Sequence, residues 1–248
     1  MTNILKQVEM SRHSRFLPTS PDEYFALRLA TALGEPSAAR HYAMLASQYP
    51  QHKLLQAYQH ALSSPAKNEN AARQFHDYLQ LLTPSGYDSV PRPRLMAVRV
   101  ERRCVAIAVF AGTHLEGFRL RHLGSDRLAA DTTTAEFIGS TLYENNCQSI
   151  AIETVSSYNR RSELKKVVID LCRSQGVSVW EVSPEPMMQA LSHPPLKTRA
   201  EIRQQMRNIW PAPDLKASEA CVSDAFALGL YVQTERLFGA DLLNGHSN

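Results

Sequence analysis

The stretch Ser149–Val182, SIAIETVSSYNRRSELKKVVIDLCRSQGVSVWEV, decides the fold class of this chain. It opens with the short apolar run SIAIE, residues 149–153, which predicts a buried strand. A helix is predicted from Arg160 to Ser174, and Gly176 then ends it. The β-branched and aromatic residues of Val177–Val182 predict a second strand. A strand, a helix and a strand in this order indicate an α/β architecture.

Three more strands are predicted before this stretch, as a meander whose first turn is the charged Glu101-Arg102-Arg103. Their predicted ranges are Leu95–Val100, Cys104–Ala111 and Gly117–His122. Further helices are predicted at 133–145, at about 198–209 and at about 218–238. The order of these elements predicts a mixed five-stranded sheet flanked by helices.

The amino-terminal third of the chain has a different character, because its patterns are helical only. A capping box, Ser20-Pro21-Asp22-Glu23, starts the first helix, with Ser20 accepting from the amide three residues on and Glu23 reaching back. Three more helices are predicted at 37–48, 51–63 and 71–82. We therefore expect a small helical module over residues 1–83, a Pro-rich linker over 84–94 and an α/β domain over 95–248. The module is predicted to contact a protein partner or to brace the next domain.

Composition excludes several classes of protein. The 248 residues carry 27 Lys and Arg against 24 Asp and Glu, a formal charge of only +3, so any nucleic-acid surface must come from locally concentrated basic residues. No apolar run approaches the ~20 residues of a membrane span, and the amino terminus lacks the apolar core of a secretory signal. The four cysteines form no C-x-x-C pair and are predicted to be reduced and mostly buried. Together these features predict a cytoplasmic protein without a membrane partner.

Four segments of the α/β region carry a resemblance to a known family. They are the SIAIE strand, the helix from Asn159 to Gly176, the proline loop from Ser183 followed by Arg199-Ala-Glu-Ile202, and Ser223-Asp224-Ala225-Phe-Ala-Leu228 in the last helix. In this order they resemble the RuvC family of Holliday-junction resolvases, which are RNase H-like nucleases. The resemblance covers residues 95–237.

The resemblance implies a metal-dependent endonuclease that acts on branched DNA as a dimer, with Mg²⁺ or Mn²⁺ as cofactor. Its metal ligands and catalytic residues would be Glu153 and Asp224, with Glu101 as a displaced third ligand, because two-metal hydrolysis needs convergent carboxylates. Two positions depart from the family pattern. Arg99 stands where the family has an aspartate on the first strand, and Cys221 stands where it has a second acid on the last helix. A guanidinium repels metal ions, and a thiol is a poor ligand for Mg²⁺.

Basic residues near these acids are candidates for phosphate contacts, with DNA expected rather than RNA. Arg199 matches the family's basic position near the scissile phosphate. Solvated roles stay open for the Arg102-Arg103 hairpin tip and for the face of the helix after Glu153. The full set of candidates is Arg102, Arg103, Arg160, Arg161, Lys165, Lys166, Lys197, Arg199 and Arg203.

Three hypotheses remain open at this point. In the first, the chain is a structure-selective nuclease that uses Glu153 and Asp224. In the second, it keeps the fold without the chemistry and binds nucleic acid or assembles a complex, with Arg99 filling the vacated metal site. In the third, the helical module makes it a protein-interaction adaptor. A salt bridge from Arg99 to Glu153 would exclude the two-metal site.

Overall fold

The computed structural model describes residues 16–64, 70–82, 94–154, 160–192, 195–211 and 219–237. By its internal contacts the chain divides into two compact units, residues 1–89 with 189–196 and residues 90–188 with 197–248. Of the linker predicted at 84–94, residues 84–93 lie outside the described residues. We call the two parts the helical unit and the sheet unit.

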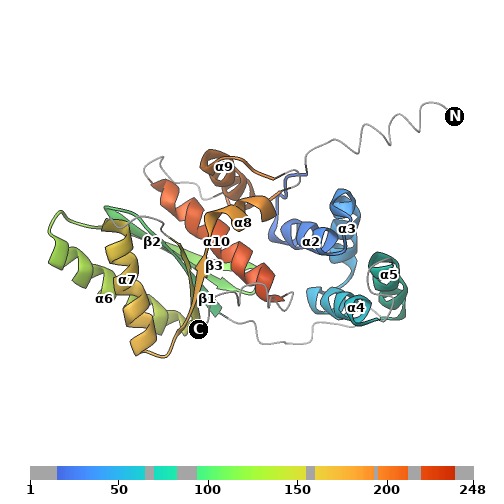
Figure 1. The fold of residues 1–248 in the computed structure, drawn as a ribbon, viewed down its shortest axis with the longest axis horizontal. Helices are drawn as coiled ribbons and strands as arrows, with labels where there is room; N and C mark the ends of the chain where they lie inside the picture. The colour runs from blue at the N-terminus through green and yellow to red at the C-terminus, as the bar shows by residue number, and fades with distance from the viewer. Residues whose placement is uncertain are drawn as a thin grey trace. The chain divides into compact units, whose positions relative to one another are not determined.

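The helical unit is built from two helical hairpins, in which α2 packs on α3 and α4 packs on α5 (Figure 1). Aromatic residues fill its interior, and Tyr24, Phe25, Tyr42 and Phe75 are completely buried. Its elements are α2 (Pro21–Ala32), the 3₁₀ turn η1 (Pro36–Ala38), α3 (Ala39–Gln48), α4 (Gln51–Ser63) and α5 (Ala71–Leu81).

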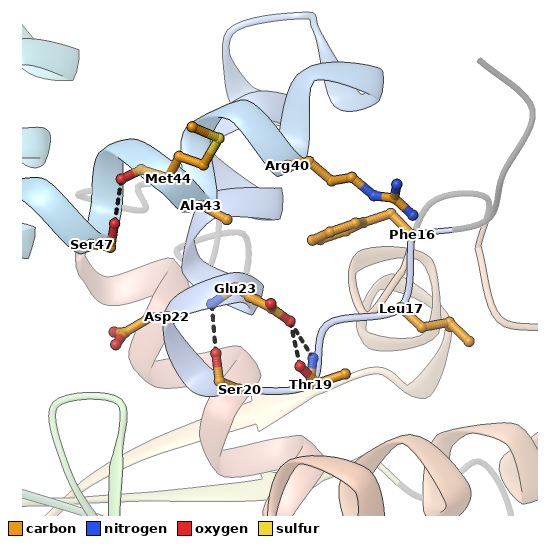
Figure 2. A pocket seen from close by; sticks show the side chains of 10 residues that line it. All are labelled: Phe16, Leu17, Thr19, Ser20, Asp22, Glu23, Arg40, Ala43, Met44 and Ser47. Carbon is orange, nitrogen blue, oxygen red and sulfur yellow. Dashed lines mark hydrogen bonds between the residues drawn. The ribbon is translucent and has the colours of Figure 1, made fainter. Parts of the chain in front are cut away.

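The predicted capping box at the start of α2 is half correct. Ser20 accepts a hydrogen bond from the Glu23 amide at 3.1 Å, as predicted (Figure 2). The Glu23 carboxylate does not return to Ser20 but accepts from the amide and the hydroxyl of Thr19, at 2.6 and 2.7 Å. The same residues line an open pocket of about 720 Å³ whose charged side chains are Asp22, Glu23 and Arg40. This mixture of charges does not make the pocket a site for a polyanion.

The sheet unit contains the predicted mixed sheet, with strand order β3-β2-β1-β4-β5. The first three strands pair antiparallel, whereas β4 runs parallel to both β1 and β5. In the register of the central pair, Val98 of β1 faces Ile152 of β4. The strands are β1 (Arg94–Val100), β2 (Cys104–Ala111), β3 (His114–His122), β4 (Ser149–Glu153) and β5 (Ser178–Val182).

Helices cover both faces of this sheet (Figure 1). On one face, α6 and α7 enclose a core with the side chains of Met96, Val98, Ile150 and Ile152. On the other face, α10 packs against β1, β2 and β4 and also contacts α9. The helices of this unit are α6 (Arg127–Asn145), α7 (Arg160–Ser174), α9 (Arg199–Ile209) and α10 (Ala220–Leu237), and the unit also contains α8 (Pro184–Ala190) up to residue 188.

Three elements differ from the prediction. Strand β3 begins at His114, three residues before the predicted Gly117. Helix α6 begins six residues earlier than the predicted 133, because Asp126 caps it by accepting from the Ala129 amide at 2.7 Å. The stretch after Ser183, predicted as a proline loop, forms the short helix α8. Pro184 is the first residue of α8. Proline is favoured there because a backbone N–H at the first helical position would have no hydrogen-bond partner within the helix.

Candidate functional site

Two adjacent parallel strands and α10 bring charged side chains together at one end of the sheet. Val98 and Val100 of β1 face the core under α6 and α7, so Arg99 between them points to the face that α10 covers. Glu153 is the last residue of β4, the strand beside β1. Asp224 lies near the start of α10, which packs on both strands. The fold therefore directs all three side chains to one point.

A single arginine contacts all three carboxylates of this site, which we call the acidic centre: Glu101, Glu153 and Asp224. Arg99 donates to Glu101 Oε1 from both Nε and Nη2, at 3.0 and 2.7 Å. Its Nη1 forms an ion pair with Glu153 Oε2, and its Nε lies 3.6 Å from Asp224 Oδ2. Arg99 is thus the common partner of the acidic centre.

Three further guanidinium groups, which we call the outer arginines, surround these contacts: Arg161, Arg199 and Arg203. Arg199 Nη2 donates to Glu153 Oε1 at 2.5 Å. Arg203 holds Asp224 with two hydrogen bonds, Nε to Oδ1 at 3.0 Å and Nη2 to Oδ2 at 2.9 Å. From α7, Arg161 Nη2 approaches Glu153 Oε1 to 4.0 Å. Each buried acid therefore has a second arginine besides Arg99.

Burial separates this cluster into two layers. The side chains of Arg99, Glu153 and Asp224 are only 5, 8 and 0% exposed, whereas those of the outer arginines are 28–32% exposed. Burial lowers the pKa of Arg99, but the carboxylates of the acidic centre outweigh this effect and raise it above the usual arginine value. Four guanidinium groups meet three carboxylates, so the formal charge of the cluster is positive; of the three carboxylates, only Glu101, at 30%, is as exposed as the outer arginines.

The residues present do not fit a divalent metal ion. Hard cations such as Mg²⁺ need several carboxylate or carbonyl oxygens free to converge on them. Here the nearest neighbour of each carboxylate is a guanidinium group, and Arg99 stands between them. Among the described residues, no group of three or more His, Cys, Asp and Glu side chains could hold a metal. The expected Mg²⁺ or Mn²⁺ site of Glu153, Asp224 and Glu101 is therefore not one that this geometry supports.

The predicted basic residues divide into those that reach the acidic centre and those that do not. The outer arginines reach it. Arg160 turns away to Asp131 at 2.6 Å and to Glu163 at 3.0 Å, and Lys165 pairs with Glu181 on β5. These two cations stabilise the packing of α7 against α6 and β5.

The other candidates lie on the surface. Arg102 and Arg103 are exposed at the tip of the β1–β2 hairpin, directly after Glu101 of the acidic centre. Lys197 is exposed just before α9, and Lys166 is exposed on α7. Their roles as phosphate contacts stay predictions.

One contact beside the acidic centre was missed by the sequence reasoning. Cys104 Sγ lies 3.5 Å from Cys221 Sγ, although 117 positions separate the two residues. The alternating pattern of β2 and the helical pattern of α10 predict which face of each element is buried. They do not predict which residues of the two elements lie against each other. The only sequence signal was Cys221, singled out because it stands in an acid position.

Other expectations concern the surroundings of the protein. Within the parts of the chain that the structure describes, no helix has the length and apolar character needed to cross a membrane. The predicted homodimer, the protein partner of the helical module and the cytoplasmic location stay predictions.

Comparisons with known proteins place this geometry in a structural class. No protein-family model and no curated protein sequence matches the chain. Among solved structures, RuvC of Thermus thermophilus superimposes with a TM-score of 0.51 at 15% identity, over 59% of this chain and 96% of that one. The same protein in complex with a Holliday junction substrate gives 0.48 at 14% identity, over 59 and 94%. The yeast mitochondrial Holliday junction resolvase Ydc2 gives 0.41 at 10%, over 76 and 97%. The mixed sheet, its flanking helices and the first of these superpositions show that the chain has a RuvC-like fold of the RNase H-like class.

Proposed function

We propose that this chain is a RuvC-like protein that binds branched DNA without a metal site and without cleaving it. One observation carries the proposal: the buried Arg99 guanidinium contacts Glu101, Glu153 and Asp224 together. A cation that belongs to the chain stands where a two-metal nuclease needs its metal ions. In this proposal the carboxylates bind the arginine instead of metal ions, so no metal ion activates a water molecule for hydrolysis.

The outer layer of the cluster supports nucleic acid as the partner. Arg161, Arg199 and Arg203 keep about 30% of their side chains exposed while their inner nitrogens hold the acids. Planar guanidinium groups of this kind suit phosphate oxygens. The exposed Arg102 and Arg103 follow Glu101 directly in the chain and extend the positive surface. These groups would contact the phosphate backbone, which fixes position without reading sequence.

The test is binding and cleavage of labelled DNA by the full chain. Four-way junctions, flaps and single strands are incubated in EDTA, and in parallel with Mg²⁺ or Mn²⁺. We expect binding in EDTA that weakens steeply as salt rises, and intact DNA in every reaction. Arg102→Ala with Arg103→Ala should weaken binding about tenfold and lower the salt slope by about two, because two phosphate contacts are lost.

A matched control uses basic residues that the fold already employs elsewhere. Arg160→Ala should leave DNA binding unchanged, because its guanidinium holds Asp131 and Glu163. Metal-dependent cleavage that Glu153→Gln abolishes would overturn the proposal and support the nuclease. Absence of binding to every substrate would leave the adaptor role of the helical unit as the remaining hypothesis.

A further inference from the structure

The four cysteines of the chain are free thiols in two different environments. Cys147 and Cys172 are buried, and burial raises the pKa of each thiol to about 11. Cys104 and Cys221 instead lie together, with their sulfur atoms 3.5 Å apart. Cys104 is partly exposed, whereas Cys221 is 5% exposed. Only this pair combines a second thiol within reach with access from solvent.

The two members of the pair differ in reactivity. The contact with the Cys221 thiol, in which either sulfur could be the donor, lowers the pKa of Cys104, and nearby Arg99 acts in the same direction. The same contact, together with burial, raises the pKa of Cys221. The thiolate is the nucleophile in sulfur chemistry. Cys104 is therefore the thiol equipped to attack first, and Cys221 is the thiol placed behind it.

We propose that Cys104 and Cys221 form a thiol–disulfide exchange site whose substrate is a low-molecular-weight disulfide of the glutathione type. In the first step, the Cys104 thiolate attacks one sulfur of the substrate. A mixed disulfide forms at Cys104, and one thiolate leaves. In the second step, Cys221 loses its proton to solvent and its sulfur attacks Cys104 Sγ, which releases the second thiolate. The chain loses two electrons and two protons, and the substrate disulfide is reduced to two thiols.

The geometry permits the second step with a small movement. The sulfur atoms must close from 3.5 Å to about 2.05 Å. Cys104 is the first residue of β2, directly after the Arg102-Arg103 turn, and Cys221 is in the first turn of α10. The resulting bond would join the hairpin tip to the helix that carries Asp224.

The test is oxidation of the native full chain by glutathione disulfide, followed by intact mass and peptide mapping of thiols blocked under denaturing conditions. We expect the wild type to lose two thiols and two hydrogen atoms, with one crosslink between the peptides of Cys104 and Cys221. Cys147 and Cys172 should stay free and serve as internal controls. Both residues are buried, Cys147 at 7% and Cys172 at 0% exposed, and neither lies beside a second thiol in the way that Cys104 and Cys221 do.

Two serine variants separate the roles within the pair. Cys221→Ser keeps a hydrogen-bond donor beside Cys104 and should stop at one glutathione adduct on Cys104. Cys104→Ser should leave Cys221 as a free thiol, because no mixed disulfide forms at position 104 for Cys221 to attack.

The proposal is overturned if the wild type stops at the adduct, if Cys221 reacts equally well in Cys104→Ser, or if Cys147 and Cys172 react at the same rate as Cys104. These readouts need no DNA, so failure of the proposed DNA binding would not affect them.

Discussion

Replacing Arg99 with methionine tests whether the arginine holds the acidic centre together. The substitution keeps a long unbranched side chain but removes the charge that Glu101, Glu153 and Asp224 share. Removing one partner of a buried ion pair costs about 3–5 kcal/mol, because the other charge stays buried. Since Arg199 still holds Glu153 and Arg203 still holds Asp224, we expect the lower end, about 3 kcal/mol. That equals roughly a hundredfold change in the unfolding constant.

The assay is urea unfolding followed by tryptophan fluorescence. The only two tryptophans of the chain, Trp180 and Trp210, both lie in the sheet unit, so their fluorescence reports on that unit alone. Wild-type stability should be equal in EDTA and in Mg²⁺, because the chain supplies its own cation. A wild type that gains stability from millimolar Mg²⁺ would show that the acids take a metal after all.

Two controls distinguish the cost of leaving buried carboxylates without Arg99 from the cost of altered side-chain packing. Arg119→Met removes the cation of an exposed ion pair with Glu144 and should cost about 0–1 kcal/mol. Adding Glu153→Gln to Arg99→Met removes one carboxylate that has lost its Arg99 partner. The double variant should therefore be at least about 1 kcal/mol more stable than the sum of the two single effects predicts. If Arg99→Met costs no more than Arg119→Met, the guanidinium is not the centre of the site.

Three further predictions concern the same unit. Gly229→Ala would place a Cβ 2.1 Å from Phe110 Cε2, so the free energy of unfolding in urea should fall by about 2–3 kcal/mol. Gly139→Ala is the control, because the atoms nearest to its added Cβ are 3.9 Å away. It should be neutral or stabilise the protein by about 0.5–1 kcal/mol. Equal effects of the two glycine substitutions would contradict this packing. Thr198→Ala removes the capping box of α9 and should lower the free energy of unfolding by about 1 kcal/mol. DNA affinity should fall as well, because α9 carries the outer arginines Arg199 and Arg203. Unchanged DNA affinity would count against a role of these two arginines in binding. Burial raises the pKa of Cys172 to about 11, so the folded thiol keeps its proton where the unfolded thiol has lost it. Stability should therefore fall as pH rises from about 9 to 11, and Cys172→Ala should flatten that fall; an identical slope would refute this assignment.

Much of the fold follows from local sequence patterns. The strand at Ser149–Glu153 and the helix at Arg160–Ser174 were predicted with the bounds that the structure shows. The strand is a short apolar run, and the helix has a helical pattern that Gly176 ends. The start of α6 was missed because the cap, Asp126, precedes a run of polar and β-branched residues that weakens the helical pattern.

The acids of the candidate site and the place of Arg99 among them were predictable, but the partners of several basic residues were not. The resemblance to the RuvC family singled out Glu153, Asp224 and Arg199, and the structure brings all three together. Sequence could not tell that Arg160 turns to α6 while its neighbour Arg161 turns to the site, because that choice depends on how α7 packs on the sheet. The contact of Cys104 with Cys221 depends in the same way on the register of α10 over β2.

The arginine also changes what the retained acids mean. Glu153 and Asp224 are residues that a nuclease of this fold would need, and taken alone they favour hydrolysis. Once Arg99 is buried between them, however, loss of either acid would leave the Arg99 guanidinium, which is only 5% exposed, with one partner fewer. The acids are then required by the arginine, whatever chemistry the protein performs. Their presence is therefore no argument for a metal site, and the positive outer layer remains as the feature that points to function.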